Sequence, residues 1–353
     1  MSGTSELYED ILAWVWRPSK ATRILDQRGG SGGSGGPRLG LSPASKTRLE
    51  RLVRKAPEVV VKVSGRTKDA GHLRAHLDYI TRNGKLEMQT DYGPMKGKEA
   101  VGELHADWAN SAEVTAQNKS LRKAPMSVNI VLSLPKGSDR EKFRDAVTDF
   151  VDRELRPRVD VVVCFHDDTA HPHAHVTVRG RDREGKTFNP RKPQLHEYRE
   201  KFAACLRHRG IDAEATPRYA RGVGMRDYPT ALPRIEQRGQ SRVRHGMIRE
   251  FRRDYDERKK NLGQARDEHP WEKAMREKHQ AVRTAYAMVA RALANSPDAR
   301  DRALSENVTR FLEAMPKDRP LTLRDRVYLG HEKRLAKEKE TEQPEPRRGA
   351  PER

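Results

Sequence analysis

Residues 160–181 read DVVVCFHDDTAHPHAHVTVRGR and hold four of the chain's 13 histidines. The apolar run before His166 is typical of a buried strand, and HAHVTV predicts a second strand that begins at His173. Alternate side chains of a strand point to the same face, so His173 and His175 project together while Ala174 is turned inward. If the two strands pair, His166 lies beside them and three imidazoles share one face of the sheet.

This arrangement indicates a metal site. Three protein ligands with open positions are typical of a catalytic metal, whereas closed structural sites usually have four ligands and favour cysteine. Cys164 and Cys205 lie in apolar stretches and are expected to be reduced core residues of a cytosolic protein. The three histidines His166, His173 and His175 are therefore the predicted metal ligands. The alternative is a group of surface histidines in a polar turn.

The turn between the two strands carries further polar residues. Asp168 is a candidate to orient a ligand imidazole by accepting its free N–H. Asp167 competes for that role, and a solvated turn carboxylate is the alternative for both. His171 sits next to Pro172 and is expected to be a spectator or to act on the ligands indirectly.

Strand and helix patterns alternate on both sides of this stretch. Strands are expected at 58–65, 126–137, 160–168, 173–181 and 186–190, and helices at 69–84, 139–155 and 196–210. The last two strands would form a hairpin around DREG. The order predicts an α/β fold in which helices flank a mixed or mainly antiparallel sheet.

The segment GRDREGKT, residues 180–187, matches the pattern of a phosphate-binding P-loop. Such a loop opens directly into a helix whose N-terminal amides hold the phosphates. Here Pro190 and Pro193 follow, and the bulky side chains of DRE suit a hairpin turn. A nucleoside triphosphatase is therefore not expected.

Composition limits the domain organisation and the partner. Of the 353 residues, 35% are hydrophobic and 35% charged, with a net charge of +20. A surplus this large favours a polyanionic partner such as nucleic acid, and no apolar run is long enough to span a membrane. GGSGGSGGP is a flexible linker by composition. We expect a flexible segment over 1–57, a globular domain over 58–228, a basic helical extension over 229–340 and a disordered tail over 341–353.

Phosphodiester chemistry fits a metal on a basic chain, and transfer of a phosphoryl group needs a protein nucleophile. The candidates are Ser133, Tyr79 and Tyr92. In the helix expected at 69–84, Tyr79 and His76 share a face that borders the apolar stripe. Periodicity alone favours a half-buried packing role for Tyr79.

Three segments in this order resemble the motifs of conjugative relaxases of the mobilisation-nuclease type: RAHLDYITRNGK (74–85), NIVLSLPKG (129–137) and FHDDTAHPHAHVTV (165–178). These relaxases belong to the HUH endonuclease superfamily, which includes the T-DNA border nuclease. The resemblance covers roughly residues 58–222. It implies a cytoplasmic enzyme with the corresponding sandwich fold, which nicks single-stranded origin-of-transfer DNA for plasmid mobilisation or conjugation.

The resemblance also implies roles for individual residues. Tyr79 matches the nucleophile, which would form a 5′-phosphotyrosyl bond, and Ser133 matches a serine that contacts DNA near the nick. The histidine triad matches the metal ligands, with Mg²⁺ or Mn²⁺ implied, although imidazoles alone favour a transition metal. Some relatives carry an acidic residue where this chain has Ala170, so the group that deprotonates the tyrosine is not identified. Other relatives use a histidine nucleophile, which keeps His76 as a rival.

Two other functions stay open on the sequence alone. One is a metal-dependent phosphodiesterase that uses water, and the other is a basic DNA-binding protein without enzymatic activity. The charged helices after residue 232 suit DNA, an accessory DNA-processing protein or a type IV secretion coupling protein as partner. A solvated extension without a partner is the alternative.

Overall fold

The computed structural model describes residues 11–13, 15–16, 41–116, 124–223, 242–260 and 268–341. The described residues fall into two compact units. Residues 41–216 form the first, which we call the sheet unit, and the remaining residues form the second, the helical unit. The Gly/Ser linker and the predicted tail from residue 342 lie outside the described residues.

The sheet unit is built on one six-stranded sheet with the order β1-β4-β6-β5-β2-β3. Every neighbouring pair is antiparallel. This confirms the predicted α/β fold with a mainly antiparallel sheet. The strands are β1 (Val60–Thr67), β2 (Met88–Thr90), β3 (Gly93–Met95), β4 (Ser127–Ser133), β5 (Val161–His166) and β6 (His173–Arg179).

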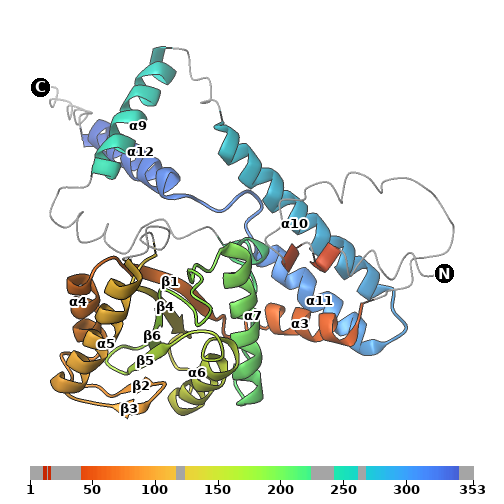
Figure 1. Ribbon diagram of the computed structural model, residues 1–353. Helices are drawn as coiled ribbons and strands as arrows, with labels where there is room; N and C mark the ends of the chain where they lie inside the picture. The colour runs from red at the N-terminus through yellow and green to blue at the C-terminus, as the bar shows by residue number, and fades with distance from the viewer. Residues whose placement is uncertain are drawn as a thin grey trace, which may run out of the picture. The chain divides into compact units, whose positions relative to one another are not determined.

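Helices cover both faces of this sheet (Figure 1). On one face, α4 (Ala70–Ile80) and α5 (Lys98–Ala116) pack on side chains such as Val162 and Cys164. On the other, α6 (Arg140–Glu154) and α7 (Lys192–His208) pack on the alternate side chains of the same strands. Because alternate side chains of a strand point to opposite faces, each strand contributes side chains to two separate cores.

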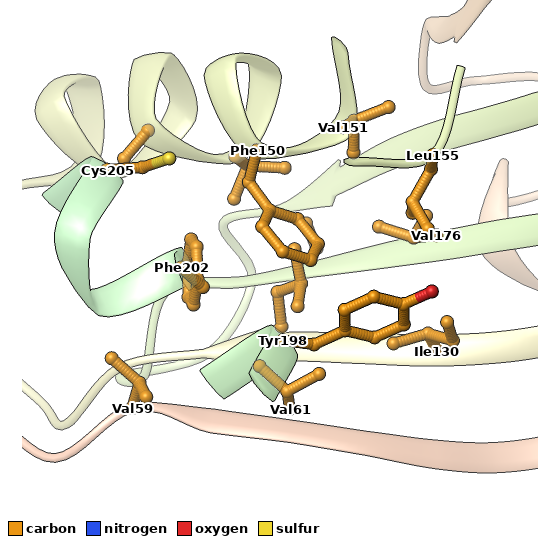
Figure 2. Close-up of a cluster of buried hydrophobic side chains, with 14 of the residues drawn as sticks. Val59, Val61, Ile130, Phe150, Val151, Leu155, Val176, Tyr198, Phe202 and Cys205 are labelled. Atoms are coloured by element: carbon orange, nitrogen blue, oxygen red, sulfur yellow. The ribbon is translucent and has the colours of Figure 1, made fainter. Parts of the chain in front are cut away.

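The core beneath α6 and α7 is rich in aromatic side chains (Figure 2). Phe150 contacts Tyr198 and Phe202 edge to face, with ring centroids 5.7 Å apart in both pairs. Burying one such side chain contributes about 1.5–3 kcal/mol. This face of the sheet carries the larger of the two cores.

Helix α4 has well-defined ends. It begins where the Asp69 carboxylate accepts a hydrogen bond from the His72 N–H at 2.8 Å, which satisfies an otherwise unpaired amide of the first turn. It ends because Arg82, Asn83 and Gly84 all have positive φ, of 53°, 57° and 80°. Gly84 is required there, since an added Cβ would lie 2.6 Å from the carbonyl carbon of Gly97. The Asn-Gly helix stop is thus confirmed.

Several segments differ from the predicted elements. Residues 186–190 are not a strand, because only the isolated bridge between Arg181 and Thr187 follows β6. Helix α7 begins at Lys192 with Pro193 in its first turn, where a missing N–H is harmless, so Pro193 does not exclude a helix there. GRDREGKT is nevertheless a turn, in which the Asp182 carboxylate accepts from backbone amides.

Four elements of the sheet unit were not predicted: α5, β2, β3 and α3 (Pro43–Val53). Helix α3 lies within the range expected to be flexible, and its Leu49 and Leu52 are buried. Arg51 of this helix pairs with Glu214 at 2.9 Å. The domain boundaries themselves stay predictions.

The helical unit contains α9 (Arg242–Lys260), α10 (Pro270–Ala294), α11 (Ala299–Ala314) and α12 (Leu323–Thr341). Helices α10 and α11 pack together, as do α9 and α12. Buried Arg324 of α12 pairs with Glu250 of α9 and Glu272 of α10. None of the helices in the described part of the chain is long and apolar enough to cross a membrane.

Candidate active site

Strands β5 and β6 bring the three predicted metal ligands together. His166 is the cross-strand partner of His173, and His175 lies opposite Cys164. All three side chains project to the α4/α5 face, while Ala174 is fully buried in the opposite core, as predicted. One potential ligand nitrogen of each imidazole lies within 4.8 Å of those of the other two. The sequence pattern therefore placed the cluster correctly.

Backbone carbonyls orient two of the rings. His166 Nε2 lies 2.7 Å from the carbonyl oxygen of Ile80, and His173 Nδ1 lies 3.1 Å from that of His171. A carbonyl only accepts, so these nitrogens carry the protons. The lone pairs are then on His166 Nδ1 and His173 Nε2. His171 itself is exposed and acts on the cluster through its main chain.

The imidazoles are suited to bind a cation. Burial, and then the neighbouring His166 and His173, lower the pKa of His175 to about 3. Burial also lowers the pKa of His166, opposed by its hydrogen bond to Ile80. Both rings are neutral at pH 7, and a neutral imidazole is the form that binds a metal. The donor set fits a divalent ion.

Tyr79 lies in the last turn of α4, beside the histidines. Its ring meets that of His175 edge to face, with centroids 5.7 Å apart, and is 6.3 Å from that of His166. The side chain is 57% exposed, so the packing role favoured by periodicity is wrong. The phenol is therefore open to solvent and lies next to three imidazoles that could bind a metal.

The rival nucleophile His76 is placed differently. Its Nε2 lies 2.9 Å from the Thr177 hydroxyl, on the surface of the sheet beneath α4. Burial, and then His72, lower its pKa to about 4. The His76 imidazole is thus engaged in a hydrogen bond between α4 and the sheet, whereas Tyr79 faces solvent.

Arg82 was missed by sequence analysis and occupies the centre of the site. Its Nη2 donates to the Asp168 carboxylate at 2.5 Å and lies 3.2 Å from His166 Nδ1. Its Cζ lies 5.2 Å from the centre of the Tyr79 ring. The predicted direct contact between Asp168 and a ligand imidazole is absent, because Ile80 already accepts the N–H of His166; Asp168 reaches the cluster through Arg82 instead.

Asp167 points to the other side of the turn, toward α6. Its carboxylate pairs with Arg140 at 3.0 Å and with Arg144. Arg140 also donates to the Thr169 carbonyl oxygen at 2.7 Å. The two arginines therefore fix the turn that connects the ligands of β5 and β6. No local pattern predicts that these arginines pair with this turn.

The two remaining nucleophile candidates are separated by the sheet register. Ser133 ends β4 as the cross-strand partner of His173, so it lies next to the cluster and is half-buried. Tyr92 lies in the turn after β2, where the adjacent Asp91 accepts from the Val161 N–H at the start of β5. His166 is at the far end of that strand, about 16 Å away at 3.3 Å per residue. Tyr92 is therefore remote from the histidines.

Comparison with known proteins agrees with this geometry. Residues 79–211 match the family model "Relaxase: MobA/VirD2-like, nuclease domain". The T-DNA border endonuclease VirD2 of Rhizobium radiobacter is 27% identical over 217 residues, which are 57% of this chain and 50% of the relative. The VirD2 of Agrobacterium fabrum (strain C58 / ATCC 33970) is 26% identical over 202 residues, 52% of this chain and 45% of the relative.

The chain thus spans about half the length of these relatives. No solved structure matches it significantly. The family match contains Tyr79, Ser133 and the whole histidine cluster, and the sheet with its flanking helices agrees with it. Residues 79–211 therefore resemble the nuclease domain of MobA/VirD2-like relaxases, which supports a DNA-nicking endonuclease of this type.

Proposed function

We propose that this protein is a site- and strand-specific DNA relaxase that nicks single-stranded origin-of-transfer DNA through Tyr79. The observation that carries the proposal is the exposed Tyr79 ring set edge to face against His175 within the cluster of three imidazoles. The similarity to endonucleases named for the T-DNA border supports DNA as the substrate. So does the net charge of +20.

In the proposed reaction the Tyr79 hydroxyl oxygen attacks the scissile phosphorus. A bond forms between this oxygen and phosphorus, and the bond from phosphorus to the 3′ oxygen breaks. The electron pair of the broken bond stays on the 3′ oxygen. A proton, equivalent to the one that the phenol loses, is then bound by this oxygen. The products are a 5′-phosphotyrosyl adduct and a free 3′ hydroxyl. A later 3′ hydroxyl can reverse the step, because the phosphodiester energy is retained.

His166, His173 and His175 would hold the divalent ion, which we propose to be Mg²⁺ or Mn²⁺. Bound there, such an ion would polarise a phosphate oxygen and stabilise the negative charge that develops on it. The chain's own contribution is to orient the His166 and His173 rings through backbone carbonyls and to lower the pKa of His166 and His175 by burial. Ser133, the cross-strand partner of His173 on β4, would contact the DNA backbone.

The resemblance to relaxases also supports a biological role in DNA transfer. We propose that nicking starts plasmid mobilisation or conjugation, with the helical unit contacting DNA, an accessory DNA-processing protein or a type IV secretion coupling protein. The buried free thiols of Cys164 and Cys205 are consistent with a cytoplasmic location.

Denaturing electrophoresis tests the proposal. The protein is incubated with Mn²⁺ and labelled single-stranded DNA tiled across the replicon that encodes it. A band of protein-linked DNA that is lost in Tyr79→Phe is the expected result. Cleavage without a protein-linked product would indicate the water-dependent phosphodiesterase, and DNA binding without cleavage would indicate a non-enzymatic binding protein.

A further inference from the structure

Arg82 is held next to the reacting groups by an unusual backbone. It is the first of the three left-handed residues after α4, and non-glycine residues other than asparagine rarely adopt this conformation. The turn directs the side chain back along α4, so that Nη1 lies 3.3 Å from the Tyr79 carbonyl oxygen. The hydrogen bond to Asp168 raises the pKa of Arg82, and the nearby Tyr79 side chain adds to this effect.

Stability does not explain this placement. The Arg82 and Asp168 side chains are 34% and 53% exposed, and ion pairs this open to solvent contribute little to folding. The same guanidinium nevertheless contacts the nucleophile, the acidic residue of the histidine motif and a metal-ligating ring. Residues that their surroundings hold in a rarely populated backbone conformation cluster at functional sites.

We propose that Arg82 is a further catalytic residue, whose guanidinium stabilises the negative charge that passes from the Tyr79 oxygen to the scissile phosphate. This inference rests on the proposed relaxase function. Asp168 is the positioning residue that keeps the guanidinium beside Tyr79. Arg82 would therefore help to activate the phenol by stabilising the negative charge on its oxygen, and not by removing its proton.

The chemistry of the guanidinium suits this role. Charge grows on the phenol oxygen as its proton leaves and then on the phosphate oxygens as the new bond forms. A guanidinium donates two parallel N–H bonds to a phosphate, which the ammonium of lysine cannot do. Removing one pre-positioned donor of this kind slows catalysis by roughly 100- to 1,000-fold in other enzymes.

Arg82 also has a measurable effect on the metal site. Its Nη2 lies 3.2 Å from His166 Nδ1, the nitrogen with the lone pair, so Arg82 must release this nitrogen before it can bind a metal. A positive charge there opposes a divalent cation. Removing it should tighten Mn²⁺ binding by roughly three- to tenfold. If Arg82 only held the imidazole in place, its removal would weaken binding instead.

The test compares Arg82→Ala and Arg82→Lys with Arg74→Ala in the full-length protein. Arg74 is a matched control, since it is a half-buried arginine on α4 that pairs with Asp78 at 3.0 Å, away from the histidines. Rates of adduct formation are measured at saturating Mn²⁺ and DNA, and Mn²⁺ affinity is measured by calorimetry without DNA.

We expect Arg82→Ala to slow adduct formation by roughly 100-fold or more, Arg82→Lys to slow it less, and Arg74→Ala to leave it unchanged. Millimolar guanidinium should restore roughly tenfold of the Arg82→Ala rate, whereas sodium chloride at equal ionic strength should not. An unchanged rate for Arg82→Ala would overturn the proposal. So would a slow variant that guanidinium does not rescue and that binds Mn²⁺ more weakly.

Failure of this inference can be separated from failure of the proposed function. If Tyr79→Phe still forms the adduct, the tyrosine relaxase assignment is wrong. If Tyr79→Phe is inactive while Arg82→Ala reacts at the normal rate, the relaxase assignment stands and Arg82 is not catalytic.

Discussion

Replacing His76 by glutamine is expected to remove part of the pH dependence of unfolding between pH 7 and pH 5. Burial, and then His72, hold the pKa of His76 at about 4 in the folded protein, against an ordinary value of 6.5. The unfolded chain therefore binds more protons between these two pH values. The stability that depends on neutral His76 is complete above pH 6.5 and is lost as the pH falls toward 4.

The magnitude follows from the two pKa values. At pH 5 the linkage relation gives a loss of at most about 2 kcal/mol, and we expect about 1–2 kcal/mol because water still reaches part of the ring. Glutamine at this position can keep a hydrogen bond to the Thr177 hydroxyl but cannot take up the proton. The variant should therefore lose about 1–2 kcal/mol less than the wild type on going from pH 7 to pH 5.

Urea unfolding at pH 7, 6 and 5, in the presence of EDTA, measures this difference. Tryptophan fluorescence is a suitable signal, because Trp108 is buried in the core beneath α4 and α5. The exposed His208 on α7 provides the control, and His208→Gln should behave as the wild type. The reasoning is refuted if His76→Gln loses as much stability as the wild type. The same variant should still form the DNA adduct, because the proposed nucleophile is Tyr79.

Three more predictions concern the metal and the DNA. His173→Ala combined with His175→Ala should abolish Mn²⁺ binding in calorimetry together with cleavage, whereas His171→Ala keeps both; equal losses would mean that the ligand set is wrong. Arg140→Ala should weaken Mn²⁺ binding about tenfold, since it releases the turn between the ligands; an unchanged affinity would contradict this. A fragment of residues 41–216 should still nick DNA, with a salt dependence of log Kd that is shallower by about 0.7 per lost phosphate contact. Equal slopes for fragment and full chain would favour a protein partner for the helical unit.

The histidine cluster was predictable because its determinants are local. The two-residue period of β6 places His173 and His175 on one face, and the short turn after β5 brings His166 beside them. Helix α5 was also within reach, since Val101, Leu104 and Trp108 follow helical spacing.

Other features of the site depend on contacts in the folded chain that no local sequence pattern predicts. Arg82 follows Tyr79 by three residues, but its position over the phenol requires the left-handed turn. Tyr79 is exposed in the last turn of α4 although the adjacent Ile80 is fully buried, whereas periodicity alone favoured packing. The pairing of Asp168 with Arg82 joins residues from the two ends of the motif set and appears only in the folded chain.

The most direct test of the account is to identify the residue that carries the DNA. The adduct formed with Mn²⁺ and the cognate single strand is digested with protease and nuclease, and the modified peptide is sequenced by tandem mass spectrometry. We predict a 5′-phosphate linkage on Tyr79 within the peptide from α4. Linkage to His76, Tyr92 or any other residue, or a 3′-phosphate linkage, would contradict the mechanism proposed for this protein.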